Sequence, residues 1–177
     1  MKNIATYSES EHLHRFACWT AARAVQRGFS GANSKSVKAA IDDSKLQSKI
    51  DDLCQSPNIT AVQFDNWHRE MGQELKSQLT QKGMQDISFG RAAKIIAIYF
   101  KTARLPSLIG TGIARVAHPP IDRQLLVALG KCGLYSRNNE VIKWTAFKEE
   151  EYYACVETLR GIVGEQPFWK IEVFWGN

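Results

Sequence analysis

Apolar residues recur at helical spacing along most of this 177-residue chain. From Glu11 to Arg27 they stand three or four positions apart, and the same pattern continues over residues 34–54, 65–83 and 90–104. An α-helix has 3.6 residues per turn, so this spacing gathers the apolar side chains on one face of each helix. The pattern therefore predicts amphipathic helices that pack together in an all-α fold.

Boundary signals separate these helices. Gly28 is expected to end the first, and Asp42-Asp43-Ser44 to break the second stretch and cap a new helix. Asp65 is the predicted N-cap of the third helix, which ends at Gly83. Leu105-Pro106 is expected to end the fourth, because the residue before a proline disfavours helical geometry.

The later part of the chain continues the helical pattern. Asp122 follows two prolines and precedes an apolar stripe that ends at Gly130, which predicts a short capped helix. A sixth helix is expected over residues 147–160, with glutamates in its first turn. Residues 168–175 are aromatic and β-branched; we predict a helix there, with a strand as the alternative. Residues 107–117 and 131–143 are predicted loops.

The chain is expected to form one domain over residues 1–177. It has no internal repeat, low-complexity tract or linker, and 44% hydrophobic residues suffice for a core. No run approaches the ~18 apolar residues of a membrane span, and the N-terminus lacks the apolar region of a signal peptide. These features predict a soluble, cytoplasmic protein with no membrane partner.

The spacing of cysteines and histidines predicts neither a metal site nor a cofactor. The four cysteines are far apart with no Cys-x-x-Cys, so we expect reduced, mostly buried thiols. His12 and His14 point in different directions on a helix and cannot both bind one ion. His68 has no partner four residues on, and the chain lacks Gly-rich nucleotide loops and a Gly-x-Ser-x-Gly elbow.

Positive charge is concentrated in one part of the sequence. The net charge of the chain is +5, but residues 91–137 carry +7, with eight basic residues against Asp122 alone. A basic segment on an otherwise mildly acidic chain is typical of a protein that binds a polyanion, most often nucleic acid. The alternative is a solvated basic face without a partner.

The order of elements around this segment predicts a helical hairpin. A helix ends at Gly83, a turn follows over residues 88–93, and the next helix begins at Lys94. The backbone N–H groups at the start of that helix would then face outward and attract phosphate. Gly90, Ala92 and Ala93 are small enough to let a nucleic-acid backbone approach.

Two motifs in this region resemble a known family. Residues 90–100 (Gly-Arg-Ala-Ala-Lys-Ile-Ile-Ala-Ile-Tyr-Phe) and residues 120–126 (Pro-Ile-Asp-Arg-Gln-Leu-Leu) are similar to the helix-hairpin-helix DNA glycosylase superfamily. The closest likeness is to compact bacterial relatives of the 8-oxoguanine DNA glycosylase branch, which has a Gly-x-Gly-x-Lys hairpin followed by Pro-Val-Asp. The resemblance covers about residues 85–130, and Ala92 replaces the second glycine.

The resemblance implies roles for particular residues. Lys94 matches the nucleophilic lysine of that branch, and Asp122 matches its catalytic aspartate. The implied base pocket is aromatic and includes Trp169, Phe174 and Trp175. The implied DNA contacts are Gly90, Arg91, Ala92, Ala93 and Arg123. The plainer alternatives are a surface lysine, a helix-capping aspartate and aromatic core packing.

The function implied by the resemblance is removal or recognition of a modified purine of the 8-oxoguanine type. A lysine nucleophile would add AP lyase activity, and some bacterial relatives look like accessory proteins of antiphage systems. Two other hypotheses stay open. One is a catalytically silent module that binds nucleic acid or a nucleotide, and the other is a helical protein that binds an acidic protein partner.

Overall fold

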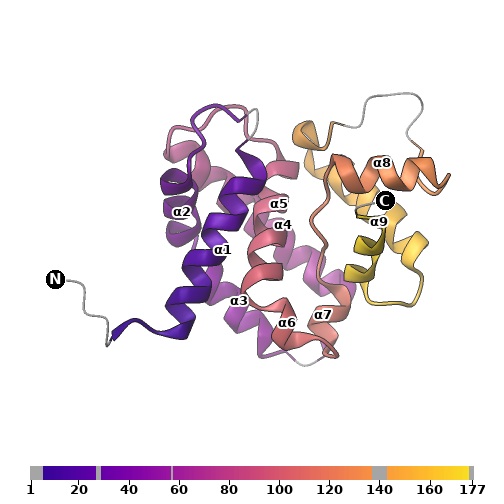
Figure 1. The fold of residues 1–177 in the computed structure, drawn as a ribbon, viewed down its shortest axis with the longest axis horizontal. Helices are drawn as coiled ribbons and strands as arrows, with labels where there is room; N and C mark the ends of the chain where they lie inside the picture. Colours follow the sequence, from indigo (N-terminus) through magenta and orange to yellow (C-terminus); the bar gives the residue numbers. More distant parts are fainter. Residues whose placement is uncertain (1–5, 27–28, 57, 137–142, 176–177) are drawn as a thin grey trace.

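The computed structural model describes residues 6–26, 29–56, 58–136 and 143–175 (Figure 1). These residues form helices and connections, with no strand among them. The structure is all-α and forms a single domain, as the periodicity predicts. Within the described ranges, no helix combines the length and the apolar character that a membrane span needs.

The helices follow one another closely along the chain. The first five are α1 (Glu9–Val25), α2 (Ser34–Asp43), α3 (Leu46–Cys54), α4 (Ala61–Gln81) and α5 (Phe89–Ala103). Then come α6 (Leu105–Leu108), α7 (Gly112–Val116), α8 (Arg123–Lys131), the 3₁₀ helix η2 (Trp144–Ala146), α9 (Glu149–Val163) and the 3₁₀ helix η3 (Phe168–Phe174).

Side-chain caps explain where several helices begin. Ser8, Asn33 and Ser88 precede α1, α2 and α5, and each accepts a hydrogen bond from the backbone N–H three residues on. Thr60 and Gln63 form a capping box at the start of α4. The cap predicted at Asp65 is therefore wrong, because α4 begins one turn earlier.

The break near residue 43 is confirmed, but its predicted cap is not. Helix α2 ends at Asp43 and α3 begins at Leu46. Lys45 holds the N-cap position of α3 in a left-handed conformation, with φ 57° and no side-chain cap bond. The Ser44 hydroxyl instead donates to the backbone oxygen of Ile41, at the end of α2.

The structure corrects one of the two predicted loops and describes only part of the other. Residues 107–117 are not a loop throughout, because α6 and α7 lie there and the Thr111 side chain caps α7. Burial of Ile113 and Ala114 stabilises α7, which is too short to be stable from propensity alone. The loop predicted over residues 131–143 falls partly outside the described residues.

Residues 168–174 are helical, as predicted, in 3₁₀ form with Phe168 and Ile171 buried.

Helix α5 lies between two hydrophobic cores. Ile95, Ile96 and Tyr99 pack into a core that α1 to α4 build, and Phe89 and Ala93 pack into a core built with α8, α9 and η3. Figure 1 shows α1 and α2 on one side of α5, and α8 and α9 on the other. Side chains on α5 that face the seam between the cores are therefore enclosed by two groups of helices.

The four cysteines are thiols and form no disulfide, as predicted, but only two of the four are buried. Cys18 and Cys155 are buried, whereas Cys54 is partly exposed and Cys132 is exposed. Burial raises the pKa of the Cys18 thiol to about 12, because a thiolate is poorly solvated there.

Candidate active site at the Lys94–Asp122 pair

The two residues with predicted catalytic roles meet in the structure. Lys94 lies in the second turn of α5 and Asp122 is the N-cap residue of α8. Their side chains, 28 positions apart in sequence, form an ion pair with Nζ 3.1 Å from Oδ2. The Lys94 side chain is 8% exposed and that of Asp122 is 13% exposed, so the pair lies just beneath the surface.

Three donors fix the orientation of the Asp122 carboxylate. Its Oδ2 accepts from Lys94, while its Oδ1 accepts from the backbone N–H of Leu125 at 3.0 Å. The same Oδ1 accepts from the indole Nε1 of Trp175 at 3.1 Å. The hydrogen bond to Leu125 is the helix cap predicted from the sequence, and the other two bonds tie α8 to α5 and to the C-terminal segment.

Two indoles flank the pair. The ring centre of Trp144, on η2, lies 4.4 Å from the Lys94 Nζ, a distance at which a cation is attracted to an aromatic face. Trp175 contacts the pair through its hydrogen bond to Asp122. Sequence reasoning missed Trp144, which stands next to a predicted loop and belongs to no motif.

The environment of Lys94 favours its neutral form more than water does. Burial lowers the pKa of the Lys94 amine, and the negative charge of Asp122 only partly opposes this effect. A lysine must lose its proton before it can act as a nucleophile, so the shift is in the direction that such chemistry needs.

A second lysine–carboxylate pair lies close by. Lys101, two turns further along α5, forms an ion pair with Glu172 on η3, and its Nζ lies 4.5 Å from the ring centre of Trp175. Burial raises the pKa of the Glu172 carboxyl, although Lys101 opposes this. Among the described residues, the buried Oε1 of Glu172 has no hydrogen-bond partner. Trp175 thus stands between the two pairs.

The predicted hairpin geometry at residues 88–93 is wrong. These residues are the N-cap and the first turn of α5, and Gly90, Ala92 and Ala93 are buried. The N–H of Gly90 donates to the backbone oxygen of Phe147 at 3.1 Å, and that of Arg91 donates to the Ser88 side chain at 3.1 Å. Both N–H groups are therefore bonded within the protein and are not available to an approaching phosphate.

Arg91 and Arg123, both predicted DNA contacts, lie in different environments. Arg91 is 8% exposed, donates to the backbone oxygen of Val25, and lies over the ring of Phe29. Its guanidinium therefore serves the packing between α1 and α5. Arg123, next to Asp122, is exposed and accessible to a phosphate.

The positive charge of residues 91–137 is dispersed by the fold. Besides the inward-facing Arg91 and Lys94, Lys101 pairs with Glu172 and Arg104 pairs with Asp51. The exposed cations of the described part of this segment are Arg115, Arg123 and Lys131. Much of the positive charge of this segment therefore takes part in contacts within the molecule.

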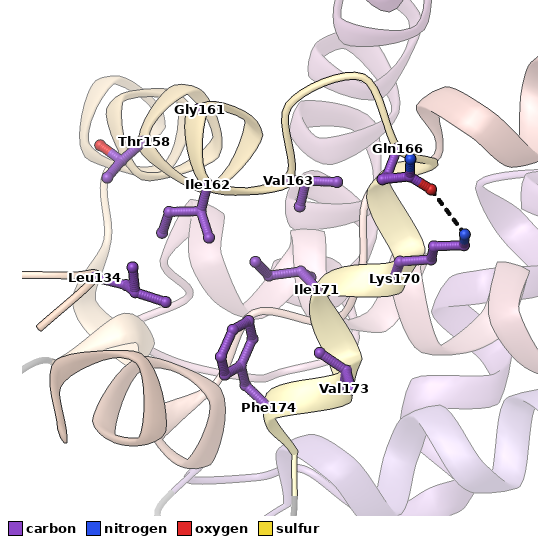
Figure 2. A pocket seen from close by; sticks show the side chains of 10 residues that line it. All are labelled: Leu134, Thr158, Gly161, Ile162, Val163, Gln166, Lys170, Ile171, Val173 and Phe174. Atoms are coloured by element: carbon purple, nitrogen blue, oxygen red, sulfur yellow. Dashed lines mark hydrogen bonds between the residues drawn. The ribbon is translucent and has the colours of Figure 1, made fainter. Parts of the chain in front are cut away.

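The predicted base pocket divides between two places. Trp175 joins the Lys94–Asp122 pair, whereas Phe174 lines a separate cavity of about 640 Å³ between α9 and η3 (Figure 2). That cavity is mainly apolar, with Lys170 and Gln166 joined by a hydrogen bond at one edge, and its lining includes neither Lys94 nor Asp122. Trp169 is half-buried on η3.

A buried polar network surrounds His118, to which the sequence assigned no role. Asp65 accepts hydrogen bonds from both guanidinium nitrogens of Arg160, at 2.7 Å each, and lies 2.8 Å from His118 Nε2. On its other side His118 contacts the hydroxyl of Tyr152 at 3.1 Å. Asp65 thus joins α4 to α9 instead of capping α4. No local spacing in the sequence connects residues this far apart.

Comparisons with protein-family models, with curated proteins and with solved structures returned no match to this chain. The candidate site is therefore interpreted from its own geometry and from the motif resemblance around residues 85–130.

Proposed function

We propose that the protein is a DNA glycosylase-like enzyme that acts on a modified purine, with Lys94 as nucleophile and Asp122 as its partner. The observation that carries the proposal is the 3.1 Å contact between these two side chains. A buried amine with a lowered pKa beside an oriented carboxylate is the arrangement that amine attack on a sugar requires.

The proposed chemistry uses each contact of the pair. Lys94 passes its proton to Asp122, and the amine lone pair forms a bond to C1′ of the sugar. The bond between C1′ and the base breaks, its electron pair leaves with the base, and Asp122 passes the proton on to the departing base. Asp122 is then a carboxylate again and stabilises the positive charge on the sugar and the attached nitrogen. Opening of the sugar ring then gives a Schiff base on Lys94.

Trp144 and Trp175 are the proposed walls of the base pocket. Both contact the Lys94–Asp122 pair, and indoles stack well on a base that has been flipped from the helix. Trp175 was expected in this role from the sequence, and Trp144 replaces Phe174 and Trp169 in the proposal.

Borohydride trapping tests the proposal. Oligonucleotides that contain 8-oxoguanine or an abasic site are incubated with the protein, and borohydride reduces any Schiff base to a stable covalent adduct. We expect an adduct with the native chain and none with Lys94→Gln. The matched control is Lys49→Gln, the same substitution at an exposed lysine on α3, which should keep the adduct.

A second candidate function is a nucleic-acid or nucleotide-binding module without chemistry. Exposed Arg123, next to Asp122, supports it, because this cation can bind a phosphate whether or not Lys94 reacts. Binding without an adduct, with affinity that falls steeply as salt rises, would support this function and contradict the enzymatic one. An adduct that persists in Lys94→Gln would also contradict the assignment of Lys94.

A further inference from the structure

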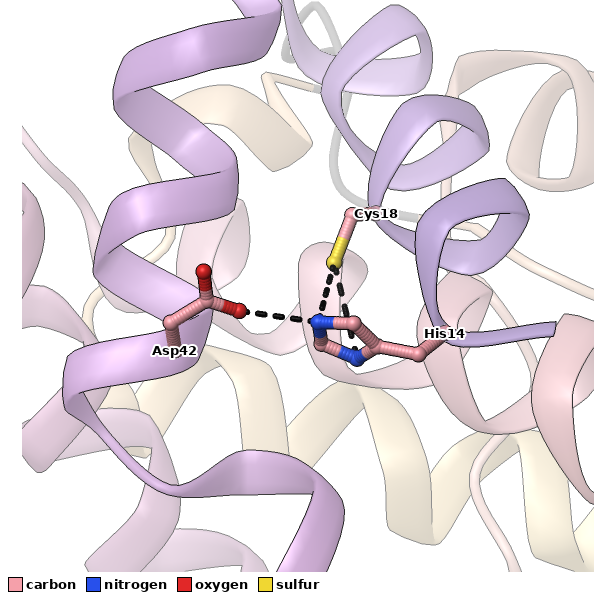
Figure 3. Close-up of side chains that lie close together, drawn as sticks. All are labelled: His14, Cys18 and Asp42. Carbon is pink, nitrogen blue, oxygen red and sulfur yellow. Dashed lines mark hydrogen bonds and ion pairs between the residues drawn. The ribbon is translucent and has the colours of Figure 1, made fainter. Parts of the chain in front are cut away.

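Three potential metal ligands from two helices lie close together in the N-terminal half of the molecule (Figure 3). His14 and Cys18 stand four residues apart on α1, and Asp42 lies near the end of α2. One ligand atom from each lies within 4.8 Å of the other two. Sequence reasoning predicted no metal site and missed the four-residue spacing that places His14 and Cys18 on one face of α1; Asp42 becomes their neighbour only in the fold.

The separations are near those of a metal coordination shell. His14 Nε2 lies 2.8 Å from Asp42 Oδ1 and 3.7 Å from Cys18 Sγ. Bonds of about 2.0–2.1 Å from Zn²⁺ to nitrogen or oxygen and about 2.3 Å to sulfur place tetrahedral ligand atoms roughly 3.3–3.6 Å apart. The Cys18 sulfur must move furthest, because it lies almost as close to Nδ1, at 3.9 Å, as to Nε2. Shifts of about 1 Å would bring the three atoms, which lie within 4.8 Å of one another, to these separations.

A buried hydroxyl positions the imidazole. The other ring nitrogen of His14, Nδ1, lies 2.8 Å from the Tyr99 hydroxyl on α5. This hydroxyl can accept a hydrogen bond from Nδ1–H, which leaves the lone pair of Nε2 free to bind an ion. Metal-binding histidines usually have such a partner on the second nitrogen.

A lysine supplies positive charge at the same place. Lys38 Nζ lies 2.6 Å from Asp42 Oδ2 and 3.3 Å from His14 Nε2. Its side chain is 39% exposed, so it can move into solvent when a divalent cation replaces its charge. Lys38 therefore competes with a metal for Asp42 and His14.

Solvent reaches this cluster through a pocket. His14 and Asp42 form part of the wall of a pocket of about 300 Å³, with Asp51 and Ser48 also on its wall. An ion held by the three ligands would have space on this side for a water molecule or another small ligand.

We propose that His14, Cys18 and Asp42 form a Zn²⁺ site with three protein ligands and an open fourth position toward the pocket. Thiolate, imidazole and carboxylate are ligands that Zn²⁺ accepts together, and three protein ligands plus water is a familiar arrangement for this ion. On binding, the Cys18 thiol releases its proton to solvent and its sulfur bonds to the metal. The site is separate from the Lys94–Asp122 pair and does not depend on its function.

Cobalt absorption tests the site in the full chain, treated with a chelator and kept reduced. Co²⁺ added to the native protein should give a thiolate-to-cobalt charge-transfer band and visible bands of tetrahedral intensity, and Zn²⁺ should abolish both. Cys18→Ser should remove the charge-transfer band. Cys155→Ser is the matched control, because Cys155 is buried in the other core, and it should leave the spectrum unchanged.

Two variants, one at exposed Asp42 and one at partly exposed Lys38, keep the test informative if Cys18→Ser does not fold. Asp42→Asn should weaken Co²⁺ binding about tenfold or more, because it removes a charged ligand. Lys38→Met should tighten binding several-fold, because it removes the competing ammonium. Absence of the charge-transfer band in the native chain would overturn the proposal. So would a Co²⁺ affinity unaffected by Asp42→Asn.

Discussion

Asp122 caps α8 and also neutralises a buried lysine, and substitutions can separate these two effects. Its Oδ1 accepts from the Leu125 N–H, and its Oδ2 from Lys94. Asparagine is as good an N-cap as aspartate but carries no charge. Alanine removes both the cap and the charge, so the pair of variants measures each contribution.

We expect Asp122→Asn to slow adduct formation in the trapping assay about 10²-fold, because charge stabilisation at the sugar is lost. Asp122→Ala should have a free energy of unfolding about 1 kcal/mol below that of Asp122→Asn, because it also lacks the cap. Urea denaturation and the trapping rate are measured for both. If Asp122→Asn reacts at the native rate, the carboxylate has no part in the chemistry and is only a helix cap.

The sequence indicated Lys94 and Asp122 because both lie in short motifs whose meaning is local. Asp122 is followed by an apolar helix, so its capping role can be read directly from neighbouring residues. Trp144 and Glu172 have no such local pattern. They reach the site because η2 packs on α5 and η3 packs on α8, and these are contacts between elements far apart in sequence.

At the scale of elements, the orientation of α5 decides what its charged residues do. The sequence prediction placed Arg91 in an exposed turn and Lys94 at the start of the next helix, because the hairpin was inferred from the order of elements along the chain. In the fold α5 has a hydrophobic core on each side, so both residues are nearly enclosed. Sequence periodicity finds a helix with one covered face well, but it does not reveal a helix that neighbours cover from two sides.

Gly90 tests how tightly η2 is fixed against α5. A Cβ at this position would lie 2.2 Å from the backbone oxygen of Trp144, so one of the two backbones must move. We expect Gly90→Ala to lower the free energy of unfolding by about 1–3 kcal/mol and to move Trp144 away from Lys94. Urea unfolding and tryptophan fluorescence measure the two effects.

The matched control for Gly90 is Gly161 in α9. No atom lies within 4 Å of a Cβ built there, so Gly161→Ala should stabilise the protein by about 0.5–1 kcal/mol through helix propensity. Equal effects of the two substitutions would show that the contact between Gly90 and Trp144 is loose in solution.

At the scale of the whole molecule, a cluster of aromatic and titratable side chains links α4, α9 and the segment before α8. His68 and His118 lie at its centre, with ring centres 4.5 Å apart, and both are buried. The charged and titratable groups that face them are Asp65 and Arg69 on α4 and Tyr152, Tyr153 and Arg160 on α9. Of this network, sequence reasoning noted the histidines only as isolated residues, because its partners come from different helices.

Burial makes this cluster sensitive to acid. Burial lowers the pKa of His68 well below its usual 6.5. It also lowers the pKa of His118, although Asp65 opposes this effect. Below about pH 6.5 the unfolded chain therefore binds protons that the folded chain excludes, so stability falls as the pH decreases. The pKa of Asp65 is also lowered: burial alone would raise it, but the hydrogen bonds from Arg160 and His118 outweigh burial. The stability that the lowered Asp65 pKa contributes is lost only below about pH 4, which lies outside the pH range in which the histidines titrate.

His68→Phe isolates one histidine of the cluster. Phenylalanine keeps the stacking on Tyr152 and removes the buried Nε2, which has no hydrogen-bond partner among the described residues. The Tyr153 hydroxyl keeps its hydrogen bond to the backbone oxygen of Asp65.

Between pH 6.5 and 5.5, the free energy of unfolding of the native protein should fall by about 1 kcal/mol more than that of His68→Phe, as one excluded proton implies. Urea unfolding at several pH values measures the slope. Parallel curves for the native chain and His68→Phe would mean that His68 takes up a proton as readily in the fold as in the unfolded chain.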